Sequence, residues 1–172
     1  MTAHLTRRTV AILALGATVS RVGHATDRLS SPRDKVILSI SGRIHAFNKD
    51  GSADFDRSML EALGMESFET TTPWYNGPVK FEGVRMNRLM QAVGASGESV
   101  TATALNDYTT DIPVADFERY GVLLAMKRDG NEMLVRDKGP LFIVYPYDSR
   151  PELKSQKFYS RSAWQVAKLE VA

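Results

Sequence analysis

The sequence predicts an α+β domain in which strands predominate and a few short helices are inserted. Short runs of alternating or β-branched apolar residues recur along the chain, two segments carry apolar residues at helical spacing, and turn-forming residues separate these runs. With 172 residues, of which 43% are hydrophobic and 24% charged, the chain has the composition of one globular domain. We expect this domain to span residues 35–172, after an exposed lead-in over residues 26–34.

Local patterns define the elements of the first half. Apolar residues alternate in Val36–Ile44, which predicts a strand with one buried face. Asp56 has the position of an N-cap for a short helix that ends before Gly64. The β-branched run Phe68–Thr72 predicts another strand. The segment Pro73–Pro78 is expected to form a loop, because both of its prolines lack an amide donor.

The second half is predicted to contain one more helix at residues 86–93, where apolar side chains recur at helical spacing. The turn pairs Asn106–Asp107 and Asp129–Gly130 predict hairpins between their flanking strands. Further strands are predicted at residues 79–84, 100–105, 108–112, 121–128, 132–135, 141–145 and 164–171. This predominance of strands over two or three short helices makes a mixed, mostly β, α+β domain.

Residues 1–25 have the pattern of a secretory signal peptide. Arg7 and Arg8 precede the apolar stretch Thr9–Val19, and cleavage is expected near Ala25. This stretch is shorter than the roughly 20 apolar residues of a membrane span, so no stable membrane insertion is expected after cleavage. The paired arginines fit both the twin-arginine route and the general secretory route. The expected location is the periplasm.

Cleavage changes the charge balance of the chain. The 22 basic residues include three in the removed segment, whereas none of the 20 acidic residues lies there, so 19 bases remain against 20 acids. A near-neutral domain lacks the basic face that neutralises phosphates. Nucleic acid is therefore not an expected partner.

The residue types present exclude several kinds of site. The sequence has no cysteine, which excludes disulfides, thiolate metal ligands and cysteine nucleophiles. His45 is the only histidine after residue 25, which excludes a histidine cluster, and a surface role is expected for it. The acidic pairs Asp54/Asp56 and Asp107/Asp111 are better explained by capping and turns than by a bound cation. No metal ligands and no catalytic residue are predicted.

Polar and aromatic residues gather in the segments predicted as loops. If these loops meet at one end of a sheet, their backbone donors, cations and flat apolar walls would surround a small anionic or heteroaromatic ligand. The alternative is that the aromatic residues belong to the core and the charges form a solvated rim. The candidate ligand-binding residues are Thr71, Thr72, Trp74, Asn106, Asp107, Tyr108, Arg136, Lys138, Tyr147 and Arg161.

Five segments occur in an order known from one protein family. They are Trp74 with Phe81–Met90, Thr103–Tyr108, Leu124–Gly130, Lys138–Pro146 and Arg161–Val171. Together they resemble the molybdopterin-binding domain of the sulfite oxidase family, over about residues 35–171. The resemblance implies a compact, mostly β, α+β fold of sulfite oxidase type, which in its catalytic members holds a molybdenum pterin.

The chain departs from that family at the metal ligand. The resemblance implies a cysteine thiolate in the stretch Phe68–Trp74, and no cysteine is present. A threonine hydroxyl, with its hard oxygen and high pKa, is a poor replacement for a soft thiolate. The resemblance also implies that Arg136, Lys138 and Arg161 mirror the family's basic contacts to the pterin phosphate.

Two functions follow as alternatives. The preferred one is an exported binding module that has the oxidoreductase-type domain but no thiolate-ligated molybdenum. It would capture a small ligand or a partner such as a periplasmic or membrane sensor protein, with no cofactor expected. The other is a molybdopterin-dependent oxidoreductase with altered metal ligation at Thr71 or Thr72. Whether the protein is an enzyme therefore stays open at this point.

Overall fold

The computed structural model describes residues 29–172, in which ten strands and four α-helices follow one another. The strands are β1 (Leu38–Gly42), β2 (Ser52–Phe55), β3 (Met65–Thr72), β4 (Tyr75–Arg85), β5 (Ser99–Ala104), β6 (Thr109–Pro113), β7 (Leu123–Arg128), β8 (Asn131–Glu132), β9 (Phe142–Val144) and β10 (Val166–Val171). The helices are α1 (Arg57–Ala62), α2 (Met86–Ala92), α3 (Val114–Tyr120) and α4 (Gln156–Ser160), with short 3-10 helices at Val135–Asp137, Tyr147–Ser149 and Pro151–Leu153. The prediction of a mostly β, α+β domain is confirmed, whereas the signal peptide predicted at residues 1–25 lies outside the described residues.

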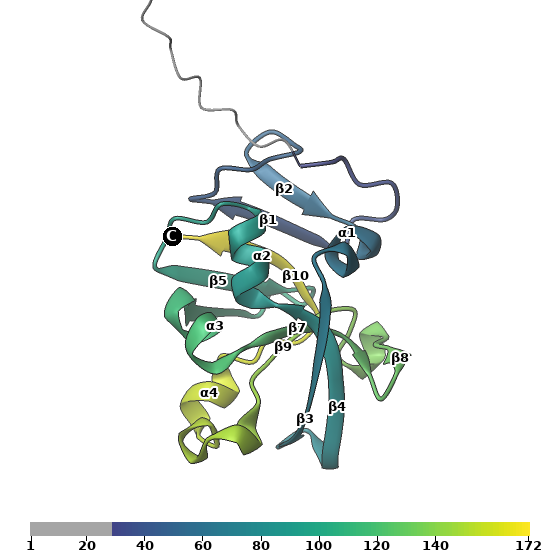
Figure 1. Cartoon of the computed structure of the whole chain (residues 1–172), viewed down its shortest axis with the longest axis vertical. Coiled ribbons are helices and arrows are strands. Elements are labelled where there is room, and N and C mark those ends of the chain that lie inside the picture. Colours follow the sequence, from purple (N-terminus) through teal and green to yellow (C-terminus); the bar gives the residue numbers. More distant parts are fainter. Residues whose placement is uncertain (1–28) are drawn as a thin grey trace, which may run out of the picture.

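The strands form two five-stranded sheets (Figure 1). The first sheet has the order β2-β1-β10-β5-β6, and its β1 and β10 are parallel while the other pairs are antiparallel. The second sheet has the order β3-β4-β7-β8, with β9 also paired to β7. Figure 1 shows the long β3–β4 hairpin extending away from the first sheet to the end of the molecule where α4 lies.

Asp56 begins α1 and also anchors the segment before β1. Its Oδ1 accepts hydrogen bonds from the Met59 amide at 2.9 Å and the Ser58 hydroxyl at 2.7 Å. Its Oδ2 accepts from the amides of Arg33 and Asp34 at 2.8 and 3.1 Å. Together these donors hold the pKa of the carboxyl well below its usual range. The predicted N-cap is confirmed, and it ties the lead-in to the domain.

The expected loop at Pro73–Pro78 is wrong. Only Pro73 and Trp74 form the turn, and β4 already begins at Tyr75. Pro78 lies opposite Thr71 of β3, while β7 pairs with β4 only from Phe81 onward. At Pro78 the strand therefore has a neighbour on one side only, next to a register irregularity. Proline is tolerated at such positions of a sheet.

Three short elements, β2, α3 and α4, were not predicted. Elements of four to seven residues span at most about two periods, so their patterns are weak. For α3 a signal was present, because Val114, Phe117 and Tyr120 are three residues apart and Gly121 follows in the left-handed conformation that ends a helix. The predicted hairpin after Gly130 is confirmed but short, since β8 has two residues.

Buried residues from both sheets form one hydrophobic cluster. Its aromatic part runs from Phe81 through Phe142 to Trp74, with ring centroids 5.7 and 5.5 Å apart. Trp74 is only partly buried, so this aromatic row connects the core with the surface beside the β3–β4 turn. Within residues 29–172, no helix has the length and apolar character needed to span a membrane.

Candidate ligand-binding site

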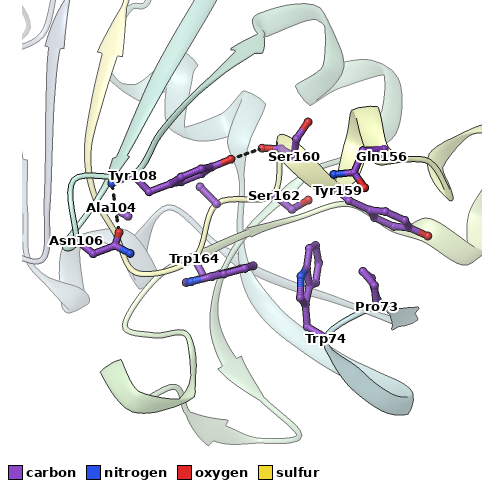
Figure 2. Close-up of a pocket in the computed structure, with 11 residues that line it drawn as sticks. Pro73, Trp74, Ala104, Asn106, Tyr108, Gln156, Tyr159, Ser160, Ser162 and Trp164 are labelled. Atoms are coloured by element: carbon purple, nitrogen blue, oxygen red, sulfur yellow. Dashed lines mark hydrogen bonds between the residues drawn. The ribbon is translucent and has the colours of Figure 1, made fainter.

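A cavity of about 370 Å³ opens where three segments meet (Figure 2). These are the turn between β3 and β4, the turn between β5 and β6, and the stretch from α4 to the start of β10. The lining residues are Pro73, Trp74, Ala104, Asn106, Tyr108, Gln156, Tyr159, Ser160, Ser162, Ala163 and Trp164. The sequence analysis made ligand binding depend on the polar and aromatic loops meeting at one place, and these segments do meet.

Aromatic rings make the walls of this cavity. The ring of Trp74 stands almost perpendicular to Trp164, with centroids 5.5 Å apart and an interplanar angle of 74°. Tyr159 packs on Trp74 at 6.0 Å with an angle of 77°. Figure 2 shows Tyr108 and Trp164 on opposite sides of the space, with Trp74 and Tyr159 on a third side. Edge-to-face packing keeps these rings in fixed orientations.

Polar groups are placed around the aromatic walls. The Tyr108 hydroxyl donates to the Ser160 carbonyl oxygen at 3.1 Å, which links the β5–β6 turn to α4. The Asn106 Oδ1 accepts from the Tyr108 amide at 3.3 Å. Asn106 and Gln156 are exposed residues of the lining, and among residues 29–172 neither the side-chain nitrogen of Asn106 nor the side-chain amide of Gln156 has a hydrogen-bond partner in the protein. Both amides are therefore available to a ligand.

The hydroxyl of the lining residue Ser162 is hydrogen-bonded to residues of the core behind the cavity wall. It forms a short hydrogen bond with the Tyr147 hydroxyl and donates to the Phe158 carbonyl oxygen at 3.1 Å. Burial raises the pKa of Tyr147 well above its usual range, so this phenol stays protonated. Tyr147 thus supports the cavity from the core and does not line it.

No lining residue is charged, although cations lie nearby. The Arg161 Nη1 is 2.7 Å from the Asp116 Oδ2, which also accepts from the Tyr145 hydroxyl at 2.9 Å. Burial, followed by the charge of Asp116, raises the pKa of Tyr145 far above its usual range. Arg161 is therefore one half of a partly buried ion pair that joins α3, the residue after β9 and the end of α4.

Lys138 and Arg136 also lie outside the lining, in different surroundings. The Lys138 ammonium is 4.4 Å from the Trp164 ring centroid. The Arg136 side chain is 81% exposed and pairs only weakly with Asp137, at 3.7 Å. The expectation that Arg136, Lys138, Tyr147 and Arg161 line one cleft together is therefore corrected, because tertiary contacts hold three of them elsewhere and leave Arg136 in solvent.

Thr71 and Thr72 use their polar groups within the protein. The Thr71 amide and hydroxyl donate to the two Asp148 carboxylate oxygens at 2.5 and 2.7 Å. The Thr72 hydroxyl accepts from the Trp74 amide at 3.3 Å. Lys154, followed by Thr71, stabilises the charged form of Asp148 and lowers its pKa to about 2. Both threonines shape the turn before Trp74.

Of the ten candidate residues, Trp74, Asn106 and Tyr108 line the cavity, while Asp107 occupies the exposed turn between the last two. The segment Tyr159–Ser162 belongs to the polar and aromatic loops singled out in the sequence, but only its Arg161 was chosen as a candidate, so Tyr159, Ser160, Ser162 and the following Trp164 were missed. A signal was available in Tyr159–Trp164, where aromatic residues flank serine and alanine directly before the closing strand. Because α4 was not predicted, the side chains of this run that line the cavity could not be told from the sequence.

The cofactor implied by the resemblance can be tested against these residues. A molybdenum pterin needs a soft metal ligand and a basic contact for its phosphate. The chain has no cysteine, and the Thr71 hydroxyl is bound to Asp148. Among residues 29–172, no group of three or more His, Cys, Asp or Glu side chains is placed to hold a metal ion. The residues present do not fit a molybdenum centre bound by a protein thiolate.

One comparison with known proteins identifies a family. The model of the family described as "Oxidoreductase molybdopterin binding domain" matches residues 56–148, which include the β3–β4 and β5–β6 turns of the cavity. A search of curated proteins gave no match to the chain. Because the matched region covers more than half of the sequence, this chain belongs to the oxidoreductase molybdopterin binding domain family.

Proposed function

We propose that this protein is an exported, periplasmic member of the family that binds a small planar ligand in the aromatic cavity, without thiolate-ligated molybdenum. The observation that carries the proposal is the combination of fixed aromatic walls with an uncharged lining in a chain that has no cysteine. Flat apolar walls with a few polar groups are typical of sites for small organic molecules.

The size and shape of the cavity support a single ring system as the ligand. Its volume of about 370 Å³ is at the small end of ligand pockets. Tyr108 and Trp164 face each other across the space, so a flat ring between them contacts two aromatic surfaces (Figure 2). The amides of Asn106 and Gln156 then supply hydrogen bonds for the edge of that ring.

The two tryptophans make the test direct. The sequence contains only Trp74 and Trp164, and both line the cavity. In a 1H–15N spectrum, the indole N–H signals of the purified protein should shift with saturable dependence on added planar heterocycles such as 6-carboxypterin. If neither indole signal responds to a panel of such compounds, the proposed function is wrong.

A pair of variants separates the cavity from the rest of the β5–β6 turn. Tyr108→Ala removes one aromatic wall and should weaken binding about fivefold, since an aromatic contact contributes about 1 kcal/mol. Leu105→Ala is the matched control, because Leu105 is 54% exposed in the same turn and does not line the cavity. Equal losses in both variants would indicate that the turn as a whole, and not the cavity wall, governs binding.

Metal and pterin content tests the alternative of a molybdopterin enzyme. Protein purified from the periplasm of a molybdenum-replete bacterium should contain neither molybdenum nor pterin in stoichiometric amount. Its measured mass should correspond to a chain that begins at Thr26. Near-stoichiometric molybdenum and pterin would overturn the proposal and establish non-cysteine ligation. Retention of residues 1–25 would overturn the cleaved, periplasmic location.

A further inference from the structure

We propose that the cavity selects anionic flat rings over cationic ones, and that Lys138 sets this preference through the ring of Trp164. The proposal rests on the ligand-binding function above and names the charge class of the ligand. It starts from a cation that does not line the cavity but lies against one of its walls.

The position of Lys138 is the first observation. Its ammonium is 4.4 Å from the Trp164 ring centroid and 5.9 Å from that of Tyr75. Neither Lys138 nor Tyr75 lines the cavity, so the charge lies outside the lining, against the ring of a residue that does line it. A cation at this distance interacts with the π-system of an indole.

The backbone around Lys138 holds this arrangement in place. Lys138 has φ of 72°, a left-handed conformation that is uncommon for a residue with a side chain. Its carbonyl oxygen accepts from the Gln165 amide at 3.1 Å, directly after Trp164. The Gly139 amide donates to the Leu134 carbonyl oxygen at 2.8 Å and closes the turn. Lys138 and Trp164 are therefore fixed relative to each other.

Lys138 differs from Arg161 in its ion pairing. Among residues 29–172, no carboxylate lies within ion-pair distance of Lys138, whereas Arg161 is neutralised by Asp116 at 2.7 Å. Asp107 and Lys157, which adjoin lining residues in the sequence, are exposed, so water and salt screen them. Lys138 is half-buried, and its field is screened less.

A ligand stacked on Trp164 experiences this field through the ring. A ligand stacked at about 3.5 Å on the indole face opposite Lys138 would lie roughly 8 Å from the ammonium. At that separation, a single positive charge behind a ring of low polarity raises the affinity for an anionic ligand several-fold. It lowers the affinity for a cationic ligand by a similar factor. The combined preference for an anionic over a cationic ring of the same shape is about tenfold.

Three naphthalene probes of matched shape test this inference: naphthalene-2-carboxylate, 2-naphthylmethylammonium and the neutral 2-naphthalenemethanol. Their affinities are measured from the two indole N–H signals at low ionic strength. The wild-type protein should bind the carboxylate about tenfold more tightly than the ammonium. Lys138→Gln should reduce this ratio to about twofold and leave the affinity for the neutral probe unchanged, which also shows that the cavity is intact.

Arg136→Gln is the matched control, because it removes the same charge two residues away from a side chain that is 81% exposed. Its ratio should equal that of the wild type. Equal effects of both substitutions would overturn the inference, since the preference would then come from general surface charge. An equal or tighter affinity for the ammonium would also overturn it. If none of the three probes binds, the proposed ligand-binding function itself fails.

Discussion

Replacing Arg161 by leucine removes one half of the partly buried ion pair with Asp116. The two side chains are only 19% and 11% exposed, and their charged atoms are 2.7 Å apart. Without Arg161, the carboxylate of Asp116 keeps a single hydrogen bond, from the Tyr145 hydroxyl at 2.9 Å. Leaving a buried charge without its partner costs about 3–5 kcal/mol. Because both groups have some contact with water, we expect the lower end, about 3 kcal/mol.

The measurement is the free energy of unfolding from urea titrations, together with thermal melting. A loss of about 3 kcal/mol corresponds to a decrease in Tm of about 6–12 °C for a chain of this size. Asp116→Asn combined with Arg161→Leu should lose less than the sum of the two single variants, because the pair is removed together. Arg136→Ala is the control and should stay within about 0.5 kcal/mol of the wild type, since its side chain is 81% exposed.

A wild-type stability of the Arg161→Leu variant would refute this reasoning. Arg161 would then be free of a structural role, and the interpretation of this arginine as a ligand contact would return. The expected result instead separates the two arginines by their contribution to the stability of the fold. Arg136 can be removed at little cost, whereas Arg161 cannot.

Two further predictions concern the framework of the site. Gly83→Ala should destabilise the domain by about 3 kcal/mol in urea titrations, because a Cβ at this position would be 2.0 Å from the Leu124 carbonyl oxygen of the neighbouring strand. Gly130→Asn, which meets open space in the β7–β8 turn, should be nearly neutral, and equal losses in both variants would contradict the steric argument. The pKa of Asp148 is lowered from 3.8 to about 2, so its contribution is present above about pH 4 and is lost as the pH falls toward 2. Urea midpoints between pH 7 and 2.5 should show this loss, and Asp148→Asn should make the profile flatter; a midpoint that stays constant down to pH 2.5 would contradict it.

Elements defined by neighbouring residues were predictable. Asp56 caps α1 because its carboxylate reaches the amide of Met59, an interaction within four residues. The β5–β6 hairpin follows from two strand-forming runs joined by a short turn. Pro78 was misjudged because its effect depends on whether β4 has a second neighbour at that point, and the β7 register decides this.

The candidate site was predictable only in part. Trp74, Asn106 and Tyr108 were found because aromatic and polar residues in turns are a local signal. Arg161 was misjudged because its partner Asp116 is 45 residues away, in a helix that was not predicted. A charged residue looks the same in a sequence whether it contacts a ligand or a buried carboxylate.

By itself, the sequence determined the fold class, the family and the absence of a thiolate for molybdenum. These depend on residue types, local spacing and the order of segments, each of which is a property of the chain before it folds. Only the tertiary structure decided which loops enclose the cavity, which of the nearby cations is neutralised, and that Lys138 lies against Trp164. These features are contacts between segments that are distant in the sequence. Such contacts form, and contribute to stability, only once the two sheets and α4 have packed together.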